Sequence, residues 1–314
     1  MRVVFLGSGR FAIPSLEALL TAGHDVAAVV TQPDREKGRG RELSPPPLKP
    51  VAAALGLRVL QPRRVRDPES VAALEALAPE VQVVVAYGQI LPRRVIDIAP
   101  RGTVNVHASL LPRYRGAAPV QWAIVNGEAE TGVTTMLIDE GLDTGPLLLA
   151  EATPIGADET AEALESRLAV LGGGLLVRTL KGLQEGAIVP QPQDPGRASL
   201  APLIKKEDGL MDWRLPAPAL ARRVLGFHAW PGAHTRLRSR GLRVLRAQVQ
   251  AGPGLGIEPH VPGTLLRVGR DGLVVACGEG TALRLVEVQP ESRHPMPAAA
   301  FAAGARLTPG ERLG

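Results

Sequence analysis

Cysteine is almost absent from this chain of 314 residues, in which Cys277 is the only one. A single thiol excludes a disulfide framework within the chain and a zinc site built on cysteines. Aromatic residues are also scarce, with four Phe, three Trp and two Tyr. We therefore expect a reducing compartment and an aliphatic core of Leu, Val, Ile and Ala.

Long apolar runs are missing as well. Crossing a bilayer takes about 20 consecutive apolar residues, and no stretch of the sequence approaches that length. The apolar residues 1–6 stop at Gly7-Ser8-Gly9, too early for the core of a signal peptide. We expect a cytoplasmic protein with no membrane partner. The length suits two domains, and a hydrophobic content of 45% allows each to bury a core.

Charge is distributed unevenly along the chain. Residues 1–187 hold 19 Lys/Arg and 21 Asp/Glu, a net charge of −2, whereas residues 188–314 hold 17 and 10, a net charge of +7. The basic surplus therefore lies wholly in the C-terminal part. It fits either an arginine-rich surface or a partner that carries phosphates.

Apolar runs alternate with helical periodicity through residues 1–187. Strands are predicted at 2–6, 26–31, 59–61, 81–87, 103–107 and 131–138, and helices at 11–20, 51–54, 68–78, 120–126 and 161–183. Continuous apolar strands between helices are typical of a parallel sheet covered on both faces. We predict an α/β fold for this region, a Rossmann-like, mostly parallel, doubly wound sheet that forms a catalytic domain.

The pattern changes after residue 187. Residues 188–204 are polar and rich in proline, which indicates a linker. A helix is predicted over 216–228, and short strands between glycines follow at 232–237, 242–250, 263–268, 272–277 and 282–289. Short strands of this kind predict a small C-terminal β-barrel, OB-like, over residues 205–314.

A glycine motif, Gly7-x-Gly9-x-x-Ala12, lies between the first predicted strand and helix, as in dinucleotide-binding folds. That fingerprint also needs an acidic residue at the end of the second strand. Here Asp34 instead follows Pro33 in a loop. We favour a tight strand-to-helix turn over the cofactor site of a nucleotide-dependent oxidoreductase.

A basic loop follows the second predicted strand. It holds four cations, Arg35, Lys37, Arg39 and Arg41, of which the last three alternate with Gly38 and Gly40. A charge run of this kind is commonly a solvated surface loop. Alternatively, glycines let a backbone approach a partner closely, and alternating cations can follow phosphates.

Two polar residues, Asn105 and His107, close a predicted strand. Their spacing places both side chains on one face, at the strand end where open α/β sheets bind ligands. An amide and an imidazolium can together hold an oxyanion, and His107 can act as a general acid. The alternative is a polar pair satisfied by backbone carbonyls.

An acidic, glycine-containing loop at 139–145 follows the next strand, and a carboxylate there can orient His107. The alternative is a plain turn. Its spacing does not match a calcium-binding EF-hand, and the histidines are dispersed along the chain. We therefore expect no metal.

Taken together, these segments resemble the folate-dependent formyltransferases. The signature residues are Asn105-x-His107, Ser109-Leu110-Leu111-Pro112, Gly116-Ala117-Ala118-Pro119 and Gly141-Leu142-Asp143-Thr144-Gly145. Three further parts of the chain are similar to the methionyl-tRNA formyltransferase family in particular: residues 31–35 with 38–40, residues 84–88 with 90–92, and residues 206–208 with 212–213. The first turn lacks the Thr-Pro of that family, and the residues after Gln289 match weakly.

The resemblance implies an enzyme that takes a formyl group from 10-formyltetrahydrofolate and adds it to the methionyl α-amine of initiator methionyl-tRNA. It implies catalytic roles for Asn105, His107 and Asp143. Folate contacts map onto Ser109, Leu110, Leu111, Pro112, Ile90 and Leu91, and tRNA contacts onto Arg35, Lys37, Arg39, Arg41 and Lys206. We expect the protein to be a monomer.

Three alternatives share parts of this pattern. Another folate-dependent formyltransferase, or a formyltetrahydrofolate hydrolase, would keep Asn105, His107 and Asp143, but the basic loop favours a polyanionic acceptor. An oxidoreductase would rest on the glycine motif alone. A nucleic-acid-binding module without catalysis would not need the cluster of polar residues at the strand ends. It also does not fit an N-terminal part whose net charge is neutral to acidic.

Overall fold

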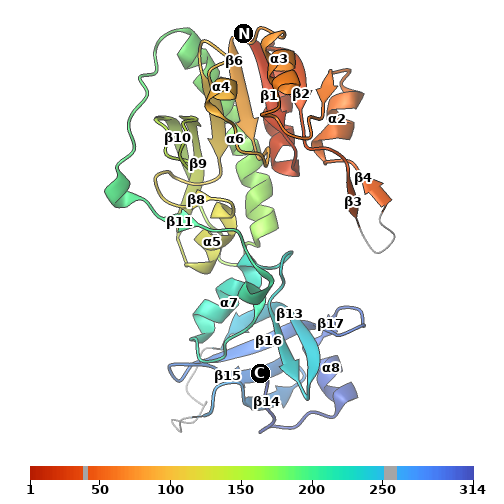
Figure 1. Ribbon diagram of the computed structural model, residues 1–314. Helices are drawn as coiled ribbons and strands as arrows, with labels where there is room; N and C mark the ends of the chain where they lie inside the picture. The colour runs from red at the N-terminus through yellow and green to blue at the C-terminus, as the bar shows by residue number, and fades with distance from the viewer. Residues whose placement is uncertain (38–41, 251–259) are drawn as a thin grey trace. The chain divides into compact units, whose positions relative to one another are not determined.

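The chain forms two compact units in the computed structural model, which describes residues 1–37, 42–250 and 260–314 (Figure 1). The first unit combines residues 1–119, 130–154 and 165–202, and the second combines 120–129, 155–164 and 203–314. The predicted boundaries of the catalytic domain at residue 187 and of the C-terminal domain at residue 205 remain a prediction, because each unit combines segments that are separated in the sequence. No helix within the described residues is long and apolar enough to cross a membrane.

A seven-stranded sheet organises the first unit, with the strand order β10-β9-β7-β6-β1-β2-β5. Its strands are β1 (Arg2–Gly7), β2 (Asp25–Val30), β5 (Val59–Leu60), β6 (Val81–Val85), β7 (Thr103–His107), β9 (Glu130–Leu137) and β10 (Leu147–Pro154). The five strands from β7 to β5 are parallel, whereas β9 and β10 pair antiparallel. The predicted mostly parallel α/β sheet is therefore confirmed.

Helices cover both faces of this sheet. The helices of the first unit are η1 (Arg10–Ala12), α1 (Ile13–Thr21), α2 (Leu48–Ala54), α3 (Pro68–Glu75), α4 (Arg93–Ile96) and η2 (Pro195–Arg197), with most of α6 (Ala161–Gln184). Val4 and Leu6 of β1 face a buried cluster that includes Leu74 of α3 and Val95 of α4. On the other face, Gly173 of α6 lies so close to α1 that a β-carbon would stand 2.8 Å from the Pro14 carbonyl oxygen.

The turn after β1 is closely packed. A β-carbon at Gly7 would stand 2.9 Å from the β-carbon of Ala12 and 3.0 Å from the carbonyl oxygen of Val85. Glycine is therefore needed here so that the strand and the following turn can approach each other, which agrees with the interpretation of the glycine motif as a packing feature.

The basic loop has secondary structure that its sequence did not indicate. Strands β3 (Arg35–Lys37) and β4 (Glu42–Ser44) form an antiparallel hairpin. At its entry, the Nζ atom of Lys49 donates to both carboxylate oxygens of Asp34, at 2.9 and 2.8 Å. Arg39 and Arg41 lie outside the described residues.

The second unit is built around an antiparallel sheet in which β12, β13, β16, β15 and β14 follow one another and β17 pairs with β16. Its strands are β12 (His234–Leu237), β13 (Arg240–Val249), β14 (Leu265–Gly269), β15 (Gly272–Ala276), β16 (Ala282–Pro290) and β17 (Met296–Pro297). Its helices are α5 (Pro119–Val125), η3 (Lys206–Gly209), α7 (Ala217–Gly226) and α8 (Ala298–Ala305), of which η3 and α8 were not expected. The predicted C-terminal β domain is confirmed as an antiparallel structure.

The core of the second unit joins helix and sheet. Leu220 and Val224 of α7 pack in one buried cluster with Leu273, Leu283 and Leu285 of the sheet. Cys277 belongs to the same cluster, and burial raises the pKa of its thiol to about 12. This cysteine is therefore a protonated, apolar core residue at neutral pH.

Candidate active site

Strand β7, an interior strand of the sheet, carries both polar residues of the predicted pair toward its C-terminal end. His107 is the last residue of the strand and its side chain is 7% exposed, whereas Asn105 is half-buried. The structure records no hydrogen bond for the Asn105 side chain with any described residue. Its amide is therefore a donor and acceptor available to a ligand.

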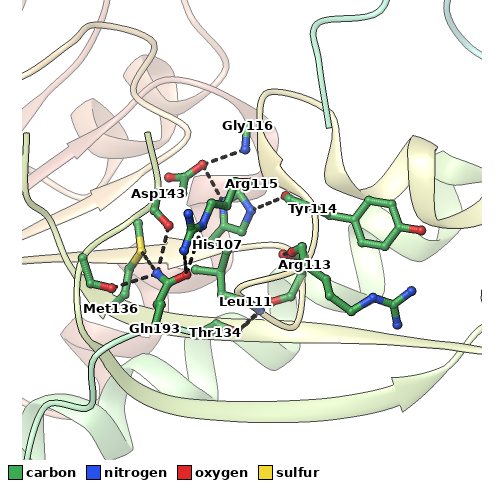
Figure 2. A network of polar contacts seen from close by, with 12 residues as sticks. His107, Leu111, Arg113, Tyr114, Arg115, Gly116, Thr134, Met136, Asp143 and Gln193 are labelled. Atoms are coloured by element: carbon green, nitrogen blue, oxygen red, sulfur yellow. Dashed lines mark hydrogen bonds and ion pairs between the residues drawn. The ribbon is translucent and has the colours of Figure 1, made fainter. Parts of the chain in front are cut away.

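The His107 ring is held from two sides (Figure 2). Its Nε2 atom lies 2.9 Å from the carbonyl oxygen of Tyr114, and its Nδ1 atom lies 3.7 Å from Oδ2 of Asp143. A carbonyl oxygen only accepts, so Nε2 carries a proton and donates it to Tyr114. Nδ1 is therefore the ring atom that faces the carboxylate and can exchange a proton with a substrate.

Asp143 lies in the loop between β9 and β10, and its side chain is 16% exposed. Its Oδ2 atom accepts a hydrogen bond of 2.8 Å from the backbone N–H of Gly116. The same loop is held internally by Asp139, whose Oδ1 atom accepts from the N–H of Gly141 at 3.0 Å and from the hydroxyl of Thr144 at 2.7 Å. The predicted approach of Asp143 to His107 is thus present.

The backbone N–H of Gly116 is positioned to donate to Asp143 because Gly116 belongs to a pair of short strands. Strands β8 (Arg115–Gly116) and β11 (Leu200–Ala201) are parallel. Gly116 has a φ of +119°, and a β-carbon there would stand 2.7 Å from the carbonyl oxygen of Ala201. Only glycine fits both the backbone angle and this approach.

The segment 109–112 is fixed from strand β9. The hydroxyl of Thr134 donates to the Ser109 carbonyl at 2.7 Å and accepts from the Leu111 N–H at 3.1 Å. The Ser109 hydroxyl donates to the Arg113 carbonyl at 2.7 Å. Ser109 and Leu111 are buried, whereas Leu110 and Pro112 are half-buried. The side chains of residues 109–112 therefore determine the conformation of the loop, and they also contribute to the surface that a ligand can contact.

The residues of the other predicted folate segment separate into two environments. Ile90 is 93% exposed, whereas Leu91 is buried in the cluster beneath α3 and α4. On the loop of Asp143, Leu142 is also exposed, at 63%. Exposed Ile90 and Leu142 are apolar side chains that can meet a ligand, while Leu91 supports the loop from below.

One residue of the site was missed by sequence reasoning. Gln193, in the predicted linker, donates through Nε2 to the carbonyl oxygens of Asp143 and Gly145, at 2.9 and 2.8 Å. Its Oε1 atom accepts from the guanidinium of Arg115 at 2.7 and 3.1 Å. The polar, proline-rich stretch around it gives no periodic signal that would have identified it.

The predicted tRNA-binding residues are spread over both units. Arg35 is exposed on β3, where its guanidinium donates to Oε1 of Gln32 at 3.0 Å. Lys37 ends the same strand, and Arg39 and Arg41 are not described. Lys206 is exposed in the second unit, where it lines an open groove together with His234 and Arg236. This groove also contains Glu207 and Glu291, so its charge is mixed.

Hydrogen bonds at the start of the basic hairpin fix the charge of Asp34. Donation from Lys49 and from the Gln61 amide holds the pKa of the Asp34 carboxyl below its ordinary value of 3.8.

Among the described residues, no group of three or more His, Cys, Asp or Glu side chains is arranged to hold a metal ion.

Comparison with known proteins places these features in a family. The family model described as formyl transferase matches residues 1–180, and that of the formyl transferase C-terminal domain matches residues 203–306. The chain is 55% identical to a methionyl-tRNA formyltransferase of Solibacter usitatus over 100% of its length and 99% of that protein. It is 51% identical to one of Citrifermentans bemidjiense, over 100% and 96% of the two chains.

Among solved structures, the chain is similar to WlaRD, a sugar 3N-formyl transferase whose crystal structure was determined in the presence of dTDP and 5-N-formyl-THF. The TM-score is 0.67 at 15% sequence identity, and the likeness covers 94% of this chain and 99% of that one. At this identity the likeness shows a shared fold.

Proposed function

Because the chain belongs to the methionyl-tRNA formyltransferase family, we propose that it transfers the formyl group of 10-formyltetrahydrofolate to the α-amine of initiator methionyl-tRNA. The observation that carries this proposal is the His107–Asp143 pair, with Nδ1 and Oδ2 3.7 Å apart. Asn105 lies two residues before His107 on strand β7, so its side chain belongs to the same face of the strand. Formylation of this tRNA serves translation initiation.

The site fits this donor in two respects. The Asn105 amide has no partner among the described residues, and Leu142 exposes an apolar side chain beside Asp143. Residues 109–112 and Ile90 supply the further contacts to the folate, with Leu91 as support. When bound, 10-formyltetrahydrofolate supplies the formyl group, which leaves N10 for the amine nitrogen while N10 takes a proton in exchange.

The residues of the site act on charge and protons. Asn105 donates to the negative charge that develops on the formyl oxygen, and His107 donates to it from Nδ1 when the ring is protonated. Preorganised donors of this kind accelerate acyl transfer by roughly 10²–10³-fold each. Asp143 orients the ring and accepts the proton that the attacking amine loses, directly or through water.

The basic residues serve the acceptor. Arg35, Lys37, Arg39 and Arg41 bind the tRNA near its charged end, and Lys206 with the C-terminal residues 205–314 binds it through phosphates. In this division, residues 1–187 form the catalytic domain and 188–204 the linker. We further propose that the protein works as a monomer in the cytoplasm, where charged tRNA is available.

A transfer assay tests the proposal. Purified protein is incubated with 10-formyltetrahydrofolate and, in separate reactions, with charged initiator tRNA, free methionine, a dTDP-linked amino sugar or water alone. Formylation of charged tRNA and none of free methionine supports the proposal. Formylation of the sugar, or release of formate without an acceptor, would assign the site to another folate-dependent enzyme.

A further inference from the structure

The backbone of Asp143 is held in an unfavourable conformation. Its φ of +52° lies in the left-handed region, which is uncommon for residues other than glycine, although aspartate tolerates it better than most. The direction of its carboxylate toward His107 therefore depends on whatever fixes the loop 139–145. The Asp139 carboxylate stabilises the first part of this loop by accepting hydrogen bonds from Gly141 and Thr144.

Gln193 holds the other part of the loop (Figure 2). The side-chain amide has two N–H groups, and the structure gives them two carbonyl acceptors, Asp143 O at 2.9 Å and Gly145 O at 2.8 Å, beside a longer contact of 3.8 Å to the Met136 sulfur. The amide oxygen accepts from two nitrogens of Arg115, at 2.7 and 3.1 Å. Every polar atom of the Gln193 side chain is therefore used.

The backbone around Gln193 is itself anchored to the first unit. Gln191 and Leu147 exchange two backbone hydrogen bonds of 2.7 and 2.9 Å. Further along, the Ser199 hydroxyl accepts from the Tyr114 N–H at 2.9 Å, and the Ser199 carbonyl accepts from the Arg115 N–H at 2.8 Å. Tyr114 is the residue whose carbonyl holds Nε2 of His107. Residues 191–199 thus contact the supports of both His107 and Asp143.

We infer that Gln193 is a positioning residue of the formyl transfer, which acts through Asp143 by holding its backbone so that the carboxylate faces His107. The inference rests on the proposed catalytic role of that pair. A glutamine is required because only an amide donates to two carbonyls and accepts from a guanidinium at the same time. A glutamate still accepts from Arg115 but sets a negative charge against both carbonyl oxygens.

The experiment compares full-length Gln193→Ala, Gln193→Glu and a matched control, Gln191→Ala. Within the described part of the chain, the Gln191 side chain donates to the Val189 carbonyl of its own segment, at 3.1 Å, and to no other group. For each variant, kcat and both KM values are measured with charged initiator tRNA and 10-formyltetrahydrofolate, beside the thermal unfolding midpoint. Displacement of a reacting group by about 1 Å costs up to about 100-fold in rate, so we expect both Gln193 variants to lose 10- to 100-fold in kcat. Gln191→Ala keeps the parent kcat, and the KM values stay within about twofold.

The double variant Asp143→Ala/Gln193→Ala separates positioning from a general loss of structure. If Gln193 acts through Asp143, its removal changes kcat no further once the carboxylate is gone, while any loss of unfolding midpoint persists. Multiplicative losses of kcat in the double variant, or a parent-like kcat in Gln193→Glu, would overturn the inference. A parent-like kcat in Asp143→Ala alone would instead remove the proposed role of the pair, and the inference with it.

Discussion

Nδ1 of His107 and Oδ2 of Asp143 face each other at 3.7 Å, although one residue ends strand β7 and the other lies in the loop after β9. The distance exceeds that of a direct hydrogen bond, so the two groups are close neighbours that do not form one in this structure. In structures without substrate, catalytic hydrogen bonds are often longer than in the reacting complex. The two side chains can therefore move closer together and share a proton when the substrate amine binds.

The first prediction concerns the three proposed catalytic residues. Asn105→Ala, His107→Ala and Asp143→Ala should each lower kcat for charged tRNA by at least about 100-fold, because each removes a group that acts on developing charge or on a proton. Folate and tRNA dissociation constants should stay within a few-fold of the parent values. Single-turnover assays and equilibrium binding supply the two measurements.

Glu140→Ala is the matched control for Asp143. Glu140 is an exposed acidic residue of the same loop, and the structure gives it no hydrogen bond within the described residues. Its removal should leave kcat unchanged. A loss in Glu140→Ala as large as that in Asp143→Ala would mean that the net charge of the loop matters, and not the position of one carboxylate.

The second prediction concerns Thr134. Thr134→Val keeps the shape of the side chain but leaves the Ser109 carbonyl and the Leu111 N–H without their partner in a buried site. An unsatisfied buried polar group costs about 1–3 kcal/mol, so the variant should unfold at a lower temperature. Loosening of residues 109–112 should also weaken folate binding several-fold.

Thr134→Ser provides the control because it retains the hydroxyl and loses one methyl group. It should bind folate as the parent does, as measured by fluorescence titration or calorimetry. Equal folate affinity in the parent, Val and Ser variants would show that the loop does not depend on this hydroxyl.

The sequence predicted the sheet and its polar strand end because both rest on local patterns. Continuous apolar runs such as 81–87 mark buried parallel strands, and the alternation of Asn105 and His107 follows from strand geometry. The family resemblance placed Asp143 with them. Strand β9, however, runs antiparallel to β7, with Leu137 opposite Val104 and Thr134 opposite His107. The loop that carries Asp143 therefore starts beside the other end of β7, and strand order alone does not give its contact with His107.

The remaining features depend on contacts that no local pattern encodes. Gln193 meets Asp143 only because residues 191–199 pack against the rest of the first unit, and a polar, proline-rich stretch has no periodicity to show this. The hold on His107 comes from the Tyr114 carbonyl, a backbone group that every residue carries. The β3–β4 hairpin was missed because its strands are short, charged and without an apolar face.

The third prediction concerns pH and the hairpin entry. Hydrogen bonds from Lys49 and Gln61 lower the pKa of Asp34 in the folded chain below 3.8. The carboxylate therefore contributes stability that is fully present above the ordinary pKa and is lost as the pH falls through the lowered folded value. Asp34→Asn should lower the unfolding midpoint slightly at pH 7, and the difference from the parent should shrink below pH 3.8.

Glu42→Gln, an exposed acidic residue on strand β4, is the control for Asp34. Its unfolding midpoint should follow that of the parent from pH 7 down to the acid range. Calorimetric scans at a series of pH values give the comparison. A difference between Asp34→Asn and the parent that stays constant or grows toward acid pH would contradict the assigned sign.

The last prediction concerns Arg39 and Arg41, which lie outside the described residues. Gly38 and Gly40 flank Arg39 in the sequence, so the backbone there can pass close to a phosphate while the guanidinium reaches into the acceptor stem. The reacting amine is at the end of that stem. A contact that guides the stem therefore affects the productive geometry as well as the affinity.

Arg39→Ala should lower kcat/KM for charged tRNA by at least about tenfold, which corresponds to about 1.4 kcal/mol of lost transition-state binding. Arg41→Ala should lose less, because Arg41 is nearer to the stiff Pro45-Pro46-Pro47 segment. Folate affinity should be unchanged in both, since the folate contacts come from other segments. If Arg39→Ala matches the parent at low and physiological salt, the hairpin is a solvated surface feature. The recognition of tRNA would then rest on the basic C-terminal residues, where substitution of Lys206 would be the next measurement.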